Sequence, residues 1–220
     1  NFRDYSTDKH RHVDDSPFGG GAGMVLKPEP MYAAVRAVRE ESAAYEGGRC
    51  TIILDPAGEV FTQETAKELA AYEQLILICG HYEGFDARIY DLADRLVSVG
   101  DFVLTGGEIP AMLLVDATAR MLPGVLGDDT SAPTDSFYDG LLGYPQYTRP
   151  RSFEGRDVPD VLLSRNHAEI TRWRRRMSLL ATLRRRPELL ERTELTEEER
   201  AFLECREYRL LPRIRRGDDP

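Results

Sequence analysis

Short apolar runs alternate with amphipathic segments through the first part of the chain. Three runs have the length and composition of buried strands, at 51–54 (TIIL), 75–79 (LILIC) and 102–104 (FVL). Four segments have the spacing of helices that bury one face, near 30–44, 62–73, 86–96 and 108–122. This order predicts an α/β fold with a parallel sheet.

Each of the three runs ends in a turn that contains glycine or proline. The turns are DPAG at 55–58, GHYEGFD from Gly80 onward, and TGG at 105–107. Glycine lets a ligand approach the backbone closely, and the carboxyl ends of parallel strands meet at one edge of a sheet. We therefore expect a ligand cleft at this edge. The alternative is a set of tight strand-to-helix turns that bind nothing.

The second half of the chain has a different pattern. The stretch 127–149 is rich in Asp, Gly, Pro and Tyr and has no sustained period, which is typical of a linker or mobile loop. Helical spacing returns at 166–185 and 196–209, and Pro187 separates these two segments. The sequence thus predicts three parts: a domain at 1–126, a linker at 127–149 and a small all-helical domain at 150–220.

Two helix starts carry a capping-box pattern, in which a hydroxyl residue and a glutamate three positions later cap each other's backbone. Thr105 with Glu108 matches it after the third apolar run, and Thr196 with Glu199 matches it before the last helix. We expect both helices to begin there.

Composition narrows the class of protein. The 220 residues are 41% hydrophobic, which is enough for a sizeable core. No stretch approaches the roughly 18 consecutive apolar residues of a membrane span, and the polar start NFRDYSTDKH does not resemble a signal peptide. Cys50, Cys79 and Cys205 are scattered and odd in number, which favours a reducing, cytoplasmic location.

Charge is unevenly distributed. The formal net charge is −9, yet the segment 149–186 contains eleven arginines and four acidic residues. Several of these arginines surround Trp173 in the sequence TRWRRR. Arginine matches phosphate oxygens and an indole stacks on bases, so the segment is a candidate RNA-binding surface, with a solvated helix face as the alternative.

Other familiar chemistries lack support. The glycine-rich PFGGGAGM at 17–24 does not follow a strand and lacks the G-x-G-x-x-G register, so we interpret it as a flexible loop near a site. No P-loop motif occurs, and the four histidines lack the spacing of a zinc site. Arg120 and Asp135 stand out as polar candidates, although an i,i+4 pair with Asp116 and a turn aspartate are the ordinary explanations.

Taken together, several segments resemble the bacterial tRNA (guanine-N1-)-methyltransferase family, TrmD, of the SPOUT class. They run in the family's order through nearly the whole chain: HRHVDDSPFGGGAGM, LILICGHYEGFD, SVGDFVLTGGEIPAM, RMLPGVLG, DSFYDGLLGYPQYTRP and LLSRNHAEITRWR. The resemblance implies a parallel sheet with a deep trefoil knot around Gly80, Gly100 and Gly106, and a homodimer with its active sites at the subunit interface. It also implies a further strand and helix ahead of NFRDYS, without which the sheet has an exposed edge.

The same resemblance implies the reaction. S-adenosylmethionine would methylate N1 of the guanosine directly 3′ of the anticodon. Asp135 would be the general base, and Arg120 would donate a hydrogen bond to O6. Asp135 would lie on a loop that reaches the partner's knot and becomes ordered when tRNA binds. The implied cofactor residues are Leu54, Pro56, Gly80, Glu83, Gly84, Val99, Gly100, Phe102, Leu104, Gly106, Gly107 and Pro110. The implied tRNA-binding residues are Arg165, His167, Arg172, Trp173, Arg174, Arg175 and Arg176.

Some points remain open at this stage. Magnesium is associated with the family, but no site for it is identified in the sequence. Arg165 stands where relatives carry a small residue, which would alter contacts with tRNA. Two other functions remain as alternatives: a noncatalytic RNA-binding protein, and a SPOUT enzyme that methylates a ribose 2′-oxygen.

Overall fold

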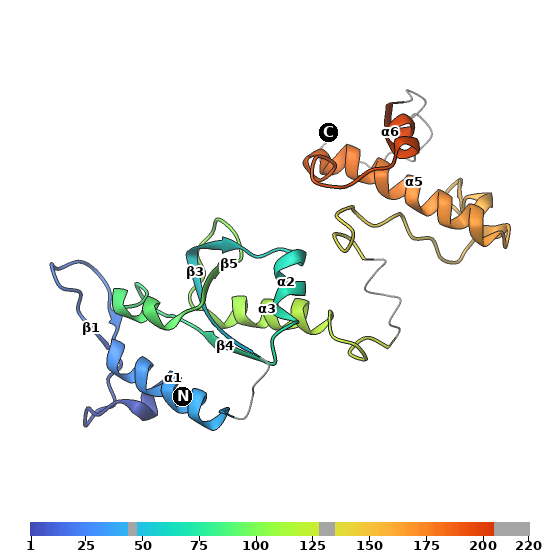
Figure 1. The fold of residues 1–220 in the computed structure, drawn as a ribbon. Coiled ribbons are helices and arrows are strands. Elements are labelled where there is room, and N and C mark those ends of the chain that lie inside the picture. Colours follow the sequence, from blue (N-terminus) through green and yellow to red (C-terminus); the bar gives the residue numbers. More distant parts are fainter. Residues whose placement is uncertain (44–47, 128–134, 205–220) are drawn as a thin grey trace. The chain divides into compact units, whose positions relative to one another are not determined.

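The structure is a computed structural model that describes residues 1–43, 48–127 and 135–204. The chain divides into two compact units, Asn1–Gly127 and Asp128–Pro220 (Figure 1). No helix in the described ranges is both long and apolar enough to cross a membrane.

The first unit is built on a parallel sheet of three strands. The order is β4 (Gln74–Ile78), β3 (Arg49–Val60) and β5 (Arg95–Ser98), so that β3 is central. Arg49 pairs with Gln74 at one end of the β3–β4 ladder, and Ile53 pairs with Ile78 at the other. This confirms the α/β class and the parallel sheet.

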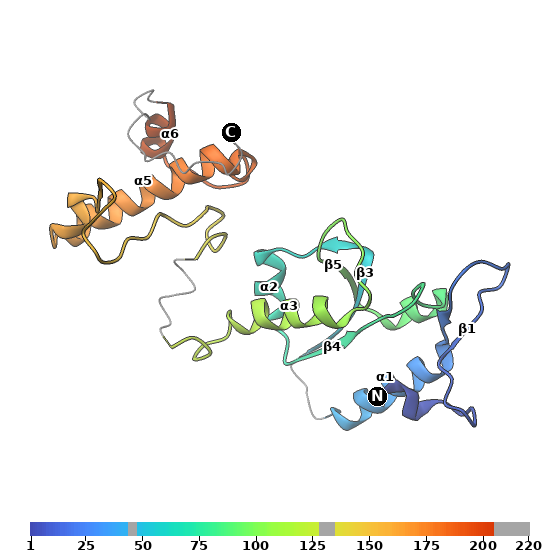
Figure 2. The ribbon, with the colours of Figure 1, turned by 180° about the vertical axis from the view of Figure 1, so that it is seen from behind.

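Helices cover both faces of the sheet. The elements are α1 (Pro28–Glu41), α2 (Gln63–Leu69), the 3-10 helix η2 (Ala87–Leu92) and α3 (Glu108–Ala119). Ile53 of β3 belongs to a core that includes side chains of α1 and η2, whereas Ile52 and Leu54 belong to a second core with α2 and α3 (Figures 1 and 2). Successive strand residues point to opposite faces, so β3 is buried from both sides.

The amino-terminal residues cover one edge of the first core. The 3-10 helix η1 (Phe2–Tyr5) packs against α1, and β1 (Asp14–Asp15) pairs antiparallel with β2 (Val25–Leu26). Val13 and Leu26 are almost fully buried in that core.

The third strand differs from its prediction. The apolar run at 102–104 is not a strand, and the strand β5 lies earlier, at Arg95–Ser98, inside the segment expected to be helical at 86–96. Residues Arg95–Ser98 form a strand because they pair with β3. That pairing involves a segment distant in sequence, so the local hydrophobic pattern does not predict it. Phe102 and Val103 are 55% and 86% exposed, in a loop that follows Gly100.

The two capping boxes have opposite outcomes. At α6 the Glu199 N–H donates to Thr196 Oγ1 (3.2 Å) and the Thr196 N–H donates to Glu199 Oε2 (2.9 Å), which confirms the prediction. At α3 the prediction is wrong, because Gly107 is the N-cap residue and no side chain caps the helix. Glu108 is hydrogen-bonded to His81 instead.

The second unit contains mostly helices. Its elements are β6 (Ser152–Phe153), β7 (Arg156–Asp157), η3 (Asp160–Leu163), α5 (His167–Arg185), η4 (Pro187–Leu189) and α6 (Glu197–Glu204). The expected helix at 166–185 is confirmed, with Asn166 as its N-cap. The part of the last expected helix at 205–209 lies outside the described residues.

The expectation of an all-helical second domain needs a correction. Strands β6 and β7 form a small antiparallel hairpin. Its two turn residues, Glu154 and Gly155, have φ angles of 50° and 73°. Two successive positive φ angles are the geometry of the tightest hairpin turns, and the glycine in the sequence FEGR is the local signal for it.

Strand β3 is interrupted by a bulge between Leu54 and Glu59. Leu54 and Glu59 both pair with Val97 of β5, so the four residues 55–58 bulge out of the ladder. A Cβ on Gly58 would lie 2.4 Å from the backbone nitrogen of Val97 and 2.4 Å from the carbonyl carbon of Leu96. The bulge therefore closes against β5 only because position 58 has no side chain.

We expect Gly58→Ala to destabilise the first unit by about 1–3 kcal/mol, since the added methyl group meets backbone that has no rotamer to change. Gly127→Ala is the matched control, because nothing lies within 4 Å of a Cβ there. Hydrogen exchange of the β3 and β5 amides in the full chain measures the difference. Equal protection in the two variants would contradict the role of Gly58.

Candidate functional site: a pocket of glycine turns and an arginine-rich helix

A pocket of about 260 Å³ lies in the first unit, where the sheet's strands end. Three loops line it: the bulge after Leu54, the turn from Gly80 to Phe85 that follows β4, and the segment from Val99 to Gly107 that follows β5. All twelve residues that the resemblance assigned to a cofactor are among the lining residues. The structure thus brings together a set that is spread from position 54 to position 110 of the sequence.

The second and third loops are joined backbone to backbone. The Gly107 N–H donates to the Gly80 carbonyl oxygen (2.9 Å), and His81 and Gly106 form an antiparallel bridge. A Cβ on Gly107 would lie 2.7 Å from the Cα of Cys79. Glycine at position 107 is what permits this close approach of one backbone segment to another, whereas the sequence pattern predicted the approach of a ligand.

A side-chain pair reinforces the same junction. Nε2 of His81 lies 2.6 Å from Oε1 of Glu108, the first residue of α3. Burial raises the pKa of Glu108, but the hydrogen bond from the backbone at the helix start and the contact with His81 outweigh it, so the net shift is downward. The pair fixes the start of α3 against the Gly80 turn.

The bulge at 55–58 is held by a residue that the sequence did not single out. The Tyr90 hydroxyl donates to Oδ2 of Asp55 (2.6 Å). Burial, followed by the hydrogen bond to Asp55, raises the pKa of Tyr90 to about 12, so the hydroxyl keeps its proton and remains a donor. Nothing in the local sequence connects positions 55 and 90. Only the fold does.

The glycine-rich loop at 17–24 lies against this site. The Glu83 N–H donates to the Met24 carbonyl oxygen (3.0 Å), and the Leu26 N–H donates to the carbonyl oxygen of Gly84 (3.0 Å). A Cβ on Gly23 would lie 2.3 Å from the Glu83 side chain. Since Glu83 and Gly84 line the pocket, this loop adjoins its rim.

The lining suits an organic ligand with an aromatic part. Apolar side chains such as Leu54, Val99 and Leu104 can cover a flat ring, and the glycine turns offer backbone N–H and C=O groups for hydrogen bonds. Among the described residues, no group of three or more His, Cys, Asp or Glu side chains is arranged to hold a metal ion. The thiols of Cys50 and Cys79 are free, and burial raises the pKa of both.

Arg120 and Asp135 belong to different units. Arg120 is half-buried and is the C-cap residue that follows α3. Asp135 is exposed and is the first described residue after 128–134, where it begins a turn in which the Tyr138 N–H donates to its carbonyl oxygen (3.4 Å). Residues 128–134 of the expected linker lie outside the described residues, so the expected ordering of this loop stays a prediction.

The turn after Asp135 is fastened to α5. The Leu142 N–H donates to Oγ1 of Thr182 (2.9 Å), and the Gly143 N–H donates to Oγ of Ser136 (2.8 Å). Leu141 is buried at 1% exposure. Asp135 therefore stands at the edge of a packed segment.

The arginines of α5 separate into two groups. Arg175 is half-buried between Oε1 of Glu199 (2.6 Å) and Oδ2 of Asp139 (2.5 Å), so it holds α6 and the turn after Asp135 to the helix. Nη2 of Arg176 lies 3.6 Å from Oε1 of Glu198, and the Arg176 guanidinium lies over the ring of Phe202. The predicted tRNA role of Arg175 thus competes with a structural role that local sequence does not reveal.

The other predicted tRNA-binding residues are more accessible. Arg172 and Arg174 are exposed, and within the described ranges neither has a carboxylate oxygen within 4.0 Å. Trp173 is half-buried between them. Arg165 is exposed with a φ of 59°, just before the exposed His167 opens α5.

Comparisons with known proteins agree with the sequence resemblance. The family model described as tRNA (Guanine-1)-methyltransferase TrmD matches residues 1–192. A tRNA (guanine-N(1)-)-methyltransferase of Levilactobacillus brevis is 56% identical over 206 residues, covering 92% of this chain and 80% of that protein. The protein of the same name from Dictyoglomus turgidum is 54% identical over 204 residues, covering 93% of this chain and 81% of its own length.

The Arg175–Glu199 pair generates a pH-dependent prediction. Burial raises the pKa of Glu199, but hydrogen bonds from Arg175 and the Thr196 backbone outweigh it, so the pKa in the folded protein is lowered. A lowered carboxyl pKa contributes stability above the pKa of the unfolded chain, and the contribution is lost as pH falls through the folded pKa.

We expect Glu199→Gln to destabilise the second unit at pH 7 by about 1–2 kcal/mol, since Gln keeps the capping box but loses the ion pair. The difference from wild type should shrink as the solution is acidified below the usual range of glutamate. Unfolding in urea, followed by the fluorescence of the single tryptophan, Trp173, measures it. Glu198→Gln is the matched control, because the Glu198 side chain is 80% exposed. Equal effects of the two variants would refute the assignment.

Proposed function

The chain belongs to the tRNA (guanine-1)-methyltransferase family, and from that membership we propose that it transfers a methyl group from S-adenosylmethionine to N1 of a guanosine in tRNA. The target is the guanosine directly 3′ of the anticodon, and the product is 1-methylguanosine. The observation that carries the proposal is the convergence of twelve residues, distant in sequence, on one pocket in the first unit. We place the reaction in the cytoplasm, where the free thiols of Cys50 and Cys79 stay reduced.

The chemistry of the pocket lining supports S-adenosylmethionine as its ligand. Leu54 and Leu104 would cover the adenine faces, and the backbone of the Gly80 and Gly106 turns would pair with its edges. Glu83 supplies a carboxylate at the rim. When bound, the compound supplies a methyl group on a sulfonium sulfur.

The protein's part in the reaction is to prepare the guanine. N1 of guanine carries a proton at neutral pH and is a poor nucleophile until that proton leaves. The Asp135 carboxylate accepts it as general base. The Arg120 guanidinium donates a hydrogen bond to O6 and stabilises the negative charge that develops there.

We further propose that two copies of the chain form the active site. A run of apolar side chains on α3 supports this: Ile109, Met112, Leu113 and Val115 are 45–72% exposed. Exposed apolar patches of this kind mark surfaces that other proteins cover. A homodimer in which Asp135 of one protomer serves the pocket of the other would bury this face and complete the site.

A trefoil knot is the finer fold proposal. The close backbone contact of Gly107 with Cys79 and Gly80 supports it, because the segment after β5 returns against the end of β4 at the place where the resemblance puts the crossing. Such a fold belongs to the few exceptions to the rule that chains do not thread loops.

Two substitutions should separate methyl transfer from cofactor binding. Asp135→Ala should lower methyl transfer by about 10²–10⁴-fold, the range for loss of a general base, and leave binding of S-adenosylmethionine unchanged by calorimetry. Arg120→Ala should behave likewise. The control is Asp91→Ala, on the exposed side of η2. Mass spectrometry of nucleosides from wild-type reactions should find 1-methylguanosine. A 2′-O-methylated nucleoside, or near-normal turnover of Asp135→Ala, would contradict the proposal.

A mixture of two inactive variants tests whether the two protomers share each active site. Leu104→Arg places a cation in the pocket and should abolish binding of the sulfonium compound. Mixing equal amounts of this variant with Asp135→Ala, under conditions that exchange protomers, should restore roughly a quarter of wild-type activity, since half of the dimers then contain one complete site. Each variant alone should stay inactive. No recovery in dimers shown to be mixed would mean that Asp135 acts within its own chain.

A further inference from the structure

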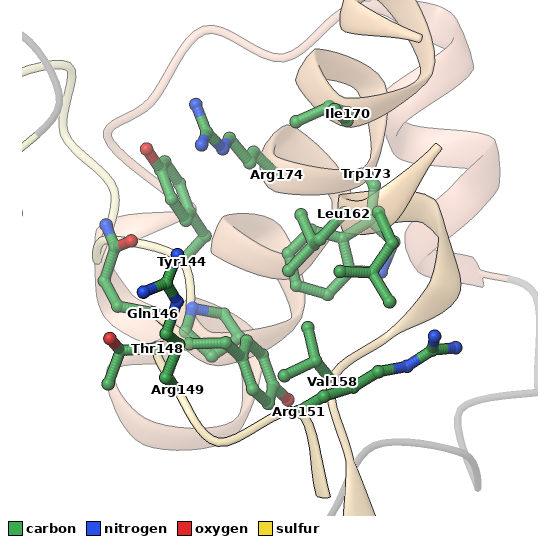
Figure 3. Close-up of a pocket in the computed structure, with 13 residues that line it drawn as sticks. Tyr144, Gln146, Thr148, Arg149, Arg151, Val158, Leu162, Ile170, Trp173 and Arg174 are labelled. Atoms are coloured by element: carbon green, nitrogen blue, oxygen red, sulfur yellow. The ribbon is translucent and has the colours of Figure 1, made fainter. Parts of the chain in front are cut away.

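A second pocket, of about 470 Å³, lies wholly within the second unit (Figure 3). One wall is the segment 144–151, another is Val158 with Leu162 and Leu163 of η3, and the third is one face of α5. Ile170, Trp173 and Arg174 share that face, because residues three and four positions apart lie together on a helix. The volume is in the range of sites that enclose small organic groups.

The interior of this pocket is aromatic and aliphatic. The rings of Tyr147 and Trp173 have centroids 6.3 Å apart and are tilted by 56°. The Arg174 guanidinium lies over the ring of Tyr144, 4.9 Å from its centroid. Ile170 and Trp173 of α5, together with Leu162 and Val158, supply the apolar part of the lining (Figure 3). Flat, weakly polar surfaces of this kind stack on nucleobases.

The polar groups of the pocket favour an anion. Arg149, Arg151 and Arg174 line it, and no aspartate or glutamate is among its described lining residues. Arg151 pairs with Asp160, whose side chain is 92% exposed. Arg149 and Arg174 have no carboxylate oxygen within 4.0 Å in the part of the chain that the structure describes. These two guanidinium groups therefore remain available to a phosphate, unlike Arg175, which two carboxylates occupy.

Groups that can distinguish one base edge from another are also present. The Gln146 amide and the Thr148 hydroxyl are also among the groups that line the pocket. An amide offers both donors and an acceptor, and a hydroxyl offers one donor and two lone pairs. Stacking surface, edge contacts and phosphate contacts are the three parts of single-stranded RNA recognition.

We propose that this pocket holds an unstacked nucleobase of the bound tRNA, together with its phosphate, at a position other than the guanine that is methylated. The inference rests on tRNA being the substrate, as proposed above. The pocket would act as an anchor that positions the RNA, with the Tyr147 ring stacking on the base, the tilted Trp173 indole contacting the edge of the base, and Arg149 and Arg174 neutralising the phosphate.

The first experiment separates stacking from charge. Tyr147→Leu should weaken binding of an unmodified tRNA transcript about fivefold to a hundredfold, the range for losing one aromatic platform, with the salt dependence of binding unchanged. Tyr147→Phe keeps the ring and should bind as wild type does. The Tyr147 side chain is on the surface, 37% exposed, so both variants should fold, and urea unfolding checks this. Equal binding of the three proteins would overturn the proposal.

The second experiment compares two arginines on one helix. Arg174→Ala should reduce the slope of log affinity against log salt by about one and should also weaken binding at high salt, where a pure charge effect fades. Arg172→Ala removes the same charge outside the pocket and should change the slope alone. If both variants behave identically at every salt concentration, the pocket makes no contribution beyond charge.

The third experiment uses the position of the only tryptophan. Saturating tRNA should quench the Trp173 fluorescence through contact of the base with the indole, and guanosine monophosphate at the same concentration should not. Quenching by the free nucleotide alone would mean that the pocket binds a small metabolite, which contradicts the proposal.

Methyl transfer measured in parallel keeps this inference separate from the proposed function. The Tyr147→Leu enzyme should show a raised KM for tRNA and a wild-type kcat. A wild-type protein that binds tRNA and quenches but transfers no methyl group would refute the function and leave the base pocket standing. If methyl transfer is normal and Tyr147→Leu changes neither tRNA binding nor KM, the proposed function stands and the base pocket is refuted.

Discussion

The hydrogen bond between the Gly107 amide and the Gly80 carbonyl is the contact on which the pocket of the first unit depends. It joins the end of β4 to the start of α3 at a distance that only glycine permits. The His81–Glu108 pair and the Tyr90–Asp55 hydrogen bond then fix the loops on either side. The pocket is thus a by-product of how closely three chain reversals approach one another.

Much of this arrangement can be predicted from sequence. The glycine turns after the apolar runs indicated a cleft, and the family resemblance named lining residues that the structure gathers in one place. The long periodic helix α5 and the Thr196–Glu199 cap were predicted for local reasons and are confirmed. Local signals suffice where an element's stability is decided by its own neighbours in sequence.

The failures have one cause in common. The run at 102–104 is as apolar as a strand, but Arg95–Ser98 takes the place beside β3. Thr105 and Glu108 have the capping pattern, but His81 takes the glutamate. The sequence TRWRRR reads as one cationic patch, yet Asp139 and Glu199 draw Arg175 inward. In each case a partner far along the chain decides between two locally acceptable outcomes.

The double ion pair of Arg175 has a consequence for how this protein can change. One guanidinium ties the segment that begins at Asp135 to the carboxyl-terminal helix α6. Substitutions in α6 that loosen Glu199 would therefore also loosen the segment that begins at Asp135, for which we propose the role of general base. Sequence changes in α6 are thus coupled, through the single side chain of Arg175, to the position of the turn that follows Asp135.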